Sequence, residues 1–523
     1  MTRDDRPQAD LPAYPWPPPQ VQAPVRRVRR VQDWLAHPLF WIVVAAAIGA
    51  FLGSQATGLA QRYAKLIVGL AFMFIIFRYP TYIGVGVFMI FYAFPTTIQI
   101  GNTNFIFIVL IAIAWMIRMG LGKEPTIRRT YLDWAIFAYV AAHLLSFINI
   151  TTPEAFSQAL KSMRHMMIPI VLYYTMVHVA GTERRLLYLA RMFTISVGVL
   201  YFTAFMERFA PRLEFIPQWY VTALGAREAT EGTVQRVGGI LTQALMSDLA
   251  AISIILQIYL ALRPRQHPFW RLGHGLLAMV SVYVVSLTGN RGGLAAMIVG
   301  LLYFFWVFSR ELSWKRVAIV GTTFLAVLIL GEKTLGRFEG NVTLLTRVAR
   351  TYFERGVPDT RRLSWGYAWS LIKQSPLTGH GPYFSHEQVT PGIRPIWPHN
   401  AYLFYLFSIG IIGLPTFLVL VGRVLKRTWA GYRLKVADVS LAHGLTAVFH
   451  IAVLQFMVGQ LRTDHQRGDV CVYVMWMLFA FGILARRIWD EERQLLLARE
   501  APAVSGPPAG PGRPVAEIGQ RAS

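Results

Sequence analysis

The chain has 523 residues, of which 54% are hydrophobic and 15% are charged, and its mean hydropathy is +0.43. These values lie outside the range of ordinary soluble domains, and the single cysteine, Cys471, excludes an intrachain disulfide and a cysteine-built metal site. The net charge of +24 would suit a nucleic-acid-binding protein, but no DNA- or RNA-binding motif stands between the apolar segments. We therefore expect no nucleic-acid partner.

Both ends of the chain are polar and of low complexity. Residues 1–38 are rich in proline and contain the arginine-rich stretch Arg26–Arg30. Because a signal peptide would begin its apolar core earlier and end at a small-residue cleavage site, we predict a disordered cytoplasmic tail followed by an uncleaved first span. Residues 491–523, rich in Ala, Pro and Gly, are predicted to form a second disordered cytoplasmic tail.

Between the two tails, apolar segments recur that are long enough to cross ~30 Å of hydrocarbon. Segments of this length satisfy their backbone in lipid only as helices. We predict an all-α fold, a polytopic transmembrane bundle of about 12–14 spans in a lipid bilayer, with one part over residues 39–331 and a C-terminal part over residues 399–490. The predicted spans are 39–56, 63–78, 80–95, 103–119, 132–149, 165–181, 186–206, 239–262, 271–288, 292–309, 315–331, 400–422, 439–460 and 469–486.

The distribution of lysine and arginine predicts the orientation of this bundle. With the N-terminus inside, these residues are more numerous in the loops assigned to the cytoplasm than in the short outer loops. Cytoplasmic loops of membrane proteins carry this excess. Both termini are therefore predicted to be cytoplasmic.

Two outer segments, 207–238 and 332–398, are larger than simple connections need to be. The second contains a stretch, Ser364–Gln374, whose apolar residues recur at helical spacing. Proline and glycine then interrupt the pattern from Pro376 onward. We interpret residues 332–398 as an outer-face domain packed on the bundle.

Cationic residues collect at the predicted outer face. Arg291 lies between two apolar segments, so its side chain should face protein or a water-filled cavity, although an arginine that reaches to the interface is the simpler alternative. The two glycines that follow it allow a backbone or a ligand to approach closely. Arg361 and Arg362 could bind phosphate oxygens in a bidentate manner, or be ordinary surface arginines.

Four further polar residues of the outer face are less informative. His399 stands directly before a predicted span, where a structural role is the alternative to catalysis. Arg236 precedes the span that contains Asp248, a carboxylate within an apolar helix that would pair with a buried cation or mark a cavity. Arg462 lies in the last outer loop.

The residues do not predict a metal or nucleotide site. The four histidines of the outer segments lack the spacing of a compact ligand motif, and we predict no metal; they are His380, His386, His399 and His465. No paired-aspartate motif of metal-dependent sugar transferases stands on the outer side, and no phosphate-binding glycine loop is present. We expect no cofactor.

Four segments in order resemble the superfamily of O-antigen ligases and polysaccharide polymerases of bacterial inner membranes, over roughly residues 235–425. They are Ser286–Leu294 with its Arg-Gly step, Arg361–Trp365, Pro376–Pro382 with His380 between paired glycines, and Pro398–Leu403 with its His399-Asn400 pair leading to Gly410–Gly413. The chain departs from the pattern at Asn290, where serine is frequent, and at Ser247-Asp248, where asparagine is frequent; the predicted fourteen spans also exceed the usual twelve or so.

The resemblance implies metal-independent, inverting transfer of a glycan from an undecaprenyl-diphosphate-linked donor to an acceptor hydroxyl at the periplasmic face. Arg291 and Arg361 would neutralise the charge that develops on the diphosphate, and His399 would accept the proton of the acceptor hydroxyl. Arg362, Arg236, Asn400 and His380 are expected to bind substrate. Other polysaccharide assembly and export proteins are expected partners.

Three activities remain open. A polymerase passes the growing chain to another lipid-linked repeat unit, whereas a ligase passes it to lipid A-core; we favour the polymerase because the chain carries extra spans and the segment 207–238. A lipid-linked glycan flippase is the alternative from another class. Against it, internal repeats are not evident and the cationic residues lie at one face rather than at the midplane.

Overall fold

The computed structural model describes residues 59–91, 103–209, 243–310, 313–336, 344–345, 359–382, 398–462 and 469–500. Over these ranges the regular secondary structure is helical, without a strand, which confirms the predicted all-α class. The helices in chain order are α3 (Leu59–Arg78), α4 (Thr81–Phe91), α5 (Thr103–Gly120), α6 (Asp133–Leu145), η2 (Ser146–Asn149), α7 (Pro153–Val179), α8 (Glu183–Phe209), α10 (Gln243–Leu262), α11 (Pro268–Thr288), α12 (Arg291–Val307), α13 (Trp314–Gly336), α15 (Asp359–Gln374), α17 (Ala401–Thr428), α18 (Leu441–Gln460) and α19 (Asp469–Glu500).

The helices form the predicted polytopic bundle. Among the described residues, seven helices are long and apolar enough to cross a membrane, namely α8, α10, α11, α13, α17, α18 and α19. Shorter apolar helices coincide with five other predicted spans; they belong to α3, α4, α5, α6 and α12. The first predicted span, 39–56, and the loop 207–238, apart from the end of α8, lie outside the described residues.

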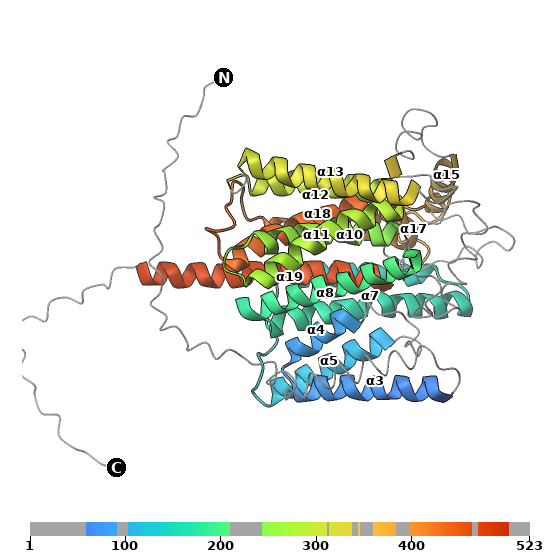
Figure 1. Ribbon diagram of the computed structural model, residues 1–523. Helices are drawn as coiled ribbons and strands as arrows, with labels where there is room; N and C mark the ends of the chain where they lie inside the picture. Colours follow the sequence, from blue (N-terminus) through green and yellow to red (C-terminus); the bar gives the residue numbers. More distant parts are fainter. Residues whose placement is uncertain are drawn as a thin grey trace, which may run out of the picture.

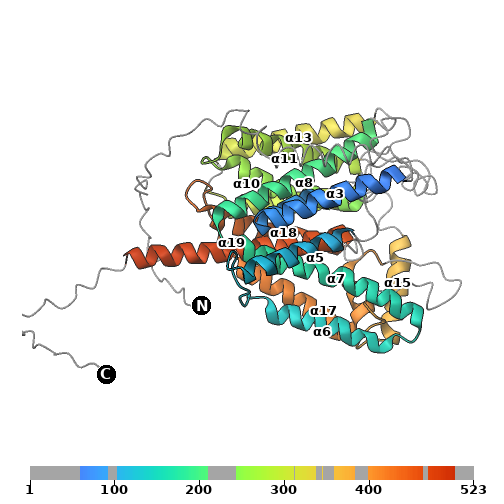
Figure 2. The ribbon, with the colours of Figure 1, turned by 90° about the horizontal axis from the view of Figure 1, so that it is seen from below.

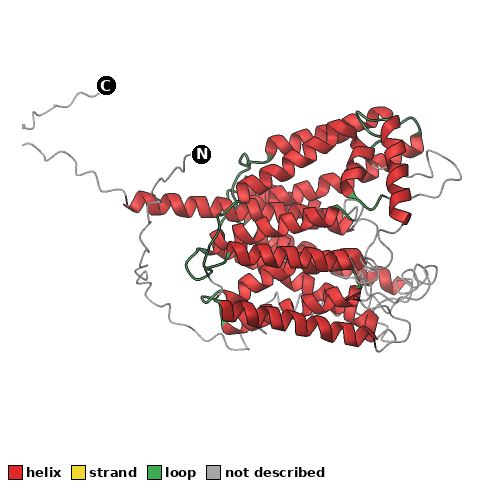
Figure 3. Cartoon of the chain, turned by 90° about the horizontal axis from the view of Figure 1, so that it is seen from above, coloured by secondary structure: helices red, strands yellow, loops and turns green. Residues whose placement is uncertain are grey.

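Most helices lie side by side, whereas α15 runs across their direction at one end of the bundle (Figures 1 and 2). Figure 3 shows the bundle from the side opposite to that of Figure 2, and helices make up the regular structure of the described part of the chain. The centre of the bundle is formed by α10, α18 and α19. Of the residues in the apolar stretch of each helix, 78%, 83% and 89% are buried inside the protein. In α13 the share is 17%, so this helix presents most of its surface outward, as expected for a helix that faces lipid.

Two helices, α7 and α19, extend furthest beyond the spans that the hydropathy pattern predicts. The span predicted at 165–181 belongs to α7, which already begins at Pro153 because Thr152 caps it: the Thr152 hydroxyl accepts a hydrogen bond from the Ala155 N–H at 3.2 Å, and proline suits the first helical position. The other, α19, continues to Glu500, so the chain is helical over 491–500, where we predicted the start of a disordered tail. Ion pairs one turn apart, such as Arg486 with Asp490, support this extension.

The helix predicted inside the outer segment is present. It is α15, which begins at Asp359, before the expected Ser364, and ends at Gln374, ahead of the predicted interruption at Pro376. Its buried residues Ala368, Leu371 and Ile372 face the bundle, and Leu371 and Ile372 pack with Phe407 of α17. The outer segment is thus attached to the bundle through the first half of α17.

Candidate functional site

The residues singled out from the sequence lie at the end of the bundle that carries α15, called the α15 end below. Successive spans run in opposite directions, so the start of α12, the start of α17 and the end of α18 lie at this end together with α15 (Figure 1). Arg291 is the first residue of α12, Arg361 belongs to the first turn of α15, and His399 stands two residues before α17. Arg236 lies outside the described residues, as does the side chain of Arg362.

The backbone of His399 is positioned by hydrogen bonds of its two neighbours. Its side chain is exposed, and its backbone has a φ of 47°, in the left-handed region that few non-glycine residues adopt. Asn400 caps α17: its Oδ1 accepts hydrogen bonds from the N–H groups of Tyr402 and Leu403 at 3.0 and 3.1 Å. The Asn400 Nδ2 donates to the carbonyl oxygen of Leu461 at 3.0 Å, which ties this cap to the end of α18.

On the other side of His399, α15 holds the preceding carbonyl. The indole N–H of Trp365 donates to the Pro398 carbonyl oxygen at 2.7 Å. Arg361 lies one helical turn before Trp365 and is partly buried, and its carbonyl accepts a hydrogen bond from the Ser364 hydroxyl at 3.0 Å. The spacing of arginine and tryptophan seen in the sequence therefore places Arg361 on the helix that positions the backbone next to His399.

The helix α17 is interrupted at Gly410, where the segment after α15 inserts. Gly410 has a φ of 68° and a ψ of −171°, and a Cβ at this position would collide with the Leu377 carbonyl, so only glycine fits. Four backbone hydrogen bonds of 2.8–3.2 Å cross this junction. They run from His380 N–H to Phe407, from Gly381 N–H to Ser408, from Ile411 N–H to Pro376 and from Ile412 N–H to Leu377.

Two polar side chains secure the inserted segment. The Asn149 Nδ2 lies 2.7 Å from the Ser375 hydroxyl, 2.7 Å from the Thr378 hydroxyl and 2.6 Å from the Gly379 carbonyl. The His380 Nε2 donates to the Leu371 carbonyl of α15 at 2.9 Å. This contact turns the imidazole of His380 toward α15, so a substrate-binding role for it stays a prediction. Asn149 was not expected from the sequence, where nothing separates it from other loop asparagines.

Arg291 is positioned by a second asparagine cap. Asn290 precedes α12, and its Oδ1 accepts hydrogen bonds from the N–H groups of Gly292 and Gly293 at 3.0 and 3.2 Å. The same oxygen accepts a hydrogen bond from the guanidinium of Arg462. Arg291, the residue between the cap and the two glycines, is partly buried.

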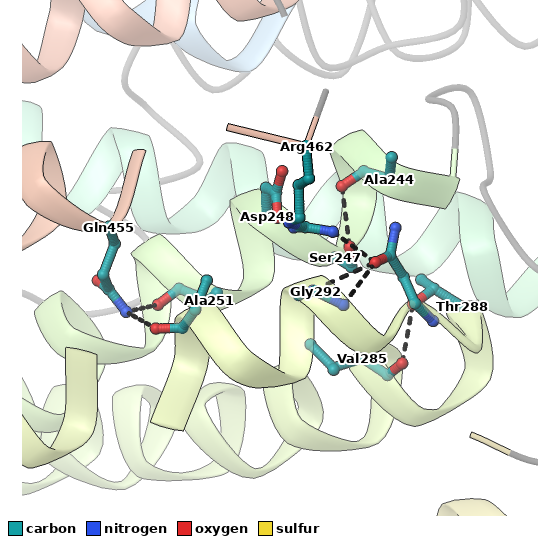
Figure 4. Close-up of polar contacts among 12 residues, drawn as sticks. Ala244, Ser247, Asp248, Ala251, Val285, Thr288, Gly292, Gln455 and Arg462 are labelled. Atoms are coloured by element: carbon teal, nitrogen blue, oxygen red, sulfur yellow. Dashed lines mark hydrogen bonds and ion pairs between the residues drawn. The ribbon is translucent and has the colours of Figure 1, made fainter. Parts of the chain in front are cut away.

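The cap of α12 is part of a largely buried polar cluster made of Asp248, Asn290 and Arg462. Figure 4 shows Asp248 and Arg462 side by side next to Gly292. Arg462 forms an ion pair with Asp248 of α10, and the two side chains are 15% and 5% exposed. Burial lowers the pKa of Arg462 to about 10, which leaves its guanidinium charged at neutral pH. A Cβ on Gly292 would collide with the Arg462 side chain, so the close approach predicted from the glycines is made by the protein itself.

The cluster assigns a partner to Asp248 that its sequence position left open. A carboxylate in an apolar helix needs a cation, and the last outer loop offered Arg462 among several choices. Arg462 was noted in the sequence but not selected as a site residue. The feature of the sequence that could have indicated Arg462 is Asp248, an isolated carboxylate in an apolar helix that requires a cation nearby.

Taken together, a continuous set of contacts links the three predicted catalytic positions. Trp365, one turn after Arg361, binds the residue before His399; Asn400, the residue after His399, binds Leu461. Arg462 then binds Asn290, the residue before Arg291. Arg291, Arg361 and His399 are thus brought to one end of the bundle, with their backbones joined through α15 and the end of α18.

Deeper in the bundle, polar side chains bind one another. The hydroxyl of Tyr201 lies 2.9 Å from the Ser253 hydroxyl and 2.8 Å from the Ser281 hydroxyl, which donates to the Gln257 Oε1 at 2.7 Å. All four side chains are at most 1% exposed. Among the described residues, no group of three or more histidine, cysteine, aspartate or glutamate side chains is arranged to hold a metal ion.

One part of the chain is similar to known proteins. Residues 246–418 match a family model described as O-antigen ligase. The chain is also similar to the O-antigen ligase of Salmonella typhimurium (strain LT2), with 28% identity over 172 residues, which cover 29% of this chain and 39% of the relative. The chain therefore spans about two fifths of the length of that relative. The matched segment includes Asn290, Arg291, Arg361 and His399.

Proposed function

We infer that this multi-pass membrane protein is a member of the O-antigen ligase superfamily, because residues 246–418 match that family model. On that basis we propose that it transfers a glycan from an undecaprenyl diphosphate carrier to an acceptor hydroxyl. We further propose that it lies in the bacterial inner membrane with both termini cytoplasmic. The α15 end then faces the periplasm. The observation that carries the proposal is the set of contacts that brings Arg291, Arg361 and His399 to this end.

The proposed reaction is a single displacement at the anomeric carbon. The acceptor oxygen forms the new bond to this carbon while the bond to the diphosphate oxygen breaks, and the electron pair leaves with the diphosphate. His399, exposed at the end of α17, accepts the acceptor proton. Arg291 and Arg361 stabilise the negative charge that develops on the diphosphate, which is the largest demand of such a step.

Direct displacement inverts the configuration of the anomeric carbon. The two arginines keep their charge at any accessible pH and present planar donors that match phosphate oxygens. This chemistry requires no metal ion to neutralise the leaving group, consistent with the metal-independent transfer expected from the sequence. Arg236, Arg362, Asn400 and His380 are retained as proposed contributors to substrate binding.

Two acceptors fit this reaction. Both matches are named O-antigen ligase, which favours lipid A-core as acceptor and thus a ligase. A polymerase, whose acceptor is a second lipid-linked repeat unit, remains the second candidate. It is favoured by the number of helices at predicted spans, because thirteen of the fourteen predicted spans coincide with helices of the described residues.

The arrangement of polar residues argues against the flippase alternative. A transporter needs accessible polar groups through the depth of the membrane. Here the deep polar side chains of α8, α10 and α11 are buried and bonded to one another, as in the set Tyr201, Ser253, Ser281 and Gln257. The proposed site, in contrast, lies at one end of the bundle.

The test is glycan analysis of a deletion strain complemented with wild type, Arg291→Ala, Arg361→Ala or His399→Ala, after each variant is shown to reach the membrane. We expect each substitution to lower transfer by roughly 10²–10⁴-fold. Lys373→Ala removes an exposed cation from the same helix as Arg361 and should restore transfer fully.

The products of the deletion strain separate the candidates. Long lipid-linked chains that never reach lipid A-core indicate a ligase. Single repeat units on the carrier or core indicate a polymerase. Full restoration by all three alanine variants would overturn the proposed transferase site and return the flippase to first place.

A further inference from the structure

The end of α18 contacts both asparagine caps of the proposed site. The Leu461 carbonyl accepts a hydrogen bond from Asn400 Nδ2 at 3.0 Å, and the next residue, Arg462, donates to the Oδ1 of Asn290. Asn400 follows His399, and Asn290 precedes Arg291. Two consecutive residues therefore determine how the proposed proton acceptor and one proposed phosphate-binding arginine lie relative to each other.

We propose that Arg462, held by Asp248, is a positioning residue for Arg291 and His399, an inference that rests on the proposed function. Its role is to fix the positions of the Asn290 and Asn400 caps relative to each other. Because its charge is paired with Asp248, it does not compete for the diphosphate of the glycan donor. It does not itself touch the reacting atoms.

The first part of this role follows from geometry. Asn290 Oδ1 accepts hydrogen bonds from two N–H groups of α12 and from Arg462, so the cap, and with it the first turn that carries Arg291, is tied to α18. A helix capped only by its own first turn could rotate or shift against its neighbours. Since displacements of about 1 Å in a site can lower a rate by ~10²-fold, loss of this tie should lower the rate of transfer.

The second part follows from charge. Arg462 lies next to the cap before Arg291, where the proposed diphosphate would bind. An unpaired guanidinium there would attract the same anion and draw it away from Arg291. Asp248, 5% exposed on α10, forms an ion pair with Arg462 and neutralises its charge. The buried pair thus supplies directional hydrogen bonding without a net charge.

The test is steady-state kinetics of the purified full-length protein in proteoliposomes. The donor is undecaprenyl-diphosphate-linked glycan extracted from the deletion strain, in the presence of excess acceptor, as identified by the complementation experiment. Rates are expressed per folded molecule, from the fraction that shows a cooperative thermal transition. The variants are Asn290→Ser, Arg462→Gln, Asp248→Asn and the double variant Asp248→Asn with Arg462→Gln.

Asn290→Ser is the mildest change, because serine, which is frequent at this position in the superfamily, is also a strong N-cap. In this chain, however, the shorter side chain loses the contact with Arg462. We expect kcat to fall about 10- to 100-fold in Asn290→Ser and Arg462→Gln, with the donor KM changed less than about threefold. In Asp248→Asn, kcat should fall similarly while the donor KM also falls, because the released guanidinium attracts the diphosphate. The double variant should return KM to the wild-type value and leave kcat low.

Loss of a charge partner within a buried pair can prevent folding. If either single charge variant fails to fold, Asn290→Ser and the double variant, which buries no unpaired charge, decide the question. Wild-type kcat per folded molecule in these two variants would overturn the inference, even if their yield is reduced, because the cluster would then be structural only.

Failure of this inference differs from failure of the proposed function. If Arg291→Ala and His399→Ala abolish transfer while Asn290→Ser and the double variant keep the wild-type kcat, only the positioning role is wrong. If Arg291→Ala and His399→Ala keep transfer, the proposed site itself is wrong, and the role of Arg462 is overturned with it.

Discussion

Hydrogen bonds to backbone groups connect helices at both ends of the bundle, but the ion pairs of the described residues differ between the two ends. At the end opposite α15, partly exposed charges connect the helices: Asp490 of α19 binds Arg427 of α17 at 2.5 Å and Arg486 of its own helix at 2.9 Å. Arginine side chains also lie over aromatic rings there, with Arg486 4.2 Å from the Trp489 ring and Arg423 4.4 Å from the Tyr131 ring.

At the α15 end, directional hydrogen bonds to the backbone surround the predicted site residues. Asparagine side chains cap α12 and α17, Trp365 binds a carbonyl, and four backbone hydrogen bonds cross the break in α17. Among the described residues of this end, Asp248 forms an ion pair with Arg462, and their side chains are 5% and 15% exposed. At the opposite end, the side chains of Asp490 and Arg427 are 26% and 35% exposed.

The difference indicates what each end has to do. Exposed charge pairs are tolerant of geometry and contribute little individually, which suffices to hold helix ends together. Hydrogen bonds to backbone groups depend on distance and angle, so they define positions within a few tenths of an ångström. A site that must place two arginines and a histidine around one substrate needs the second kind of contact.

The largest loss of stability is expected from a substitution at the interruption of α17, which tests the contacts of the α15 end. In Gly410→Ala, the new Cβ meets the Leu377 carbonyl and the backbone keeps an unfavourable φ of 68°, so we expect a loss of roughly 2–5 kcal/mol in stability. Thermal unfolding in detergent measures it. Gly422→Ala, in the same helix with open space around its Cα, is the control and should be neutral or slightly stabilising. Equal thermal midpoints for the two variants would contradict this account of the break.

A smaller effect is expected for the tryptophan that holds the Pro398 carbonyl. Trp365→Phe removes a hydrogen bond of 2.7 Å but keeps most of the ring, so stability should fall by only about 1 kcal/mol. Transfer activity should fall about tenfold, because the backbone beside His399 is released. Trp369 lies one turn later on α15, is half exposed and makes no such bond to the described residues, so Trp369→Phe should leave activity unchanged. Similar activities of the two variants in the glycan assay would show that the Trp365 bond does not position His399.

The smallest effect is expected at the opposite end. Asp490→Asn removes two partly exposed ion pairs and should cost less than about 1 kcal/mol, with no change in transfer. Its effect on the thermal midpoint should shrink further in high salt, which screens such pairs. Asp438→Asn, whose partner Lys435 lies at 3.5 Å and whose side chain is 67% exposed, should have no measurable effect. A loss of transfer activity in Asp490→Asn would contradict the division of roles between the two ends.

The local features of this protein were predictable because their causes are local. Apolar segments long enough to span a membrane predicted thirteen of the described helices, and the helical spacing of Trp365, Ala368 and Ile372 predicted α15. The two boundaries that differed most, Pro153 and Glu500, depend on a capping hydroxyl and on charge pairs one turn apart, which hydropathy does not register.

The candidate site was predictable only in part. Arg291, Arg361 and His399 could be named because charges and a histidine at the mouth of apolar helices are unusual and because the ordered motifs resemble a known superfamily. Nothing in the sequence indicated that the Asn149 amide would hold the segment after α15, since an asparagine in a loop is ordinary.

By itself, then, the sequence determined the helical class, most of the spans and the identity of the charged residues at the α15 end, because these depend on hydropathy and on neighbours a few positions away. The tertiary structure decided which of these residues act together. Asp248, Asn290 and Arg462 lie far apart in the chain, and their pairing depends on how α10, α12 and the end of α18 pack. Such contacts follow from the relative position of whole helices, which no short stretch of sequence contains.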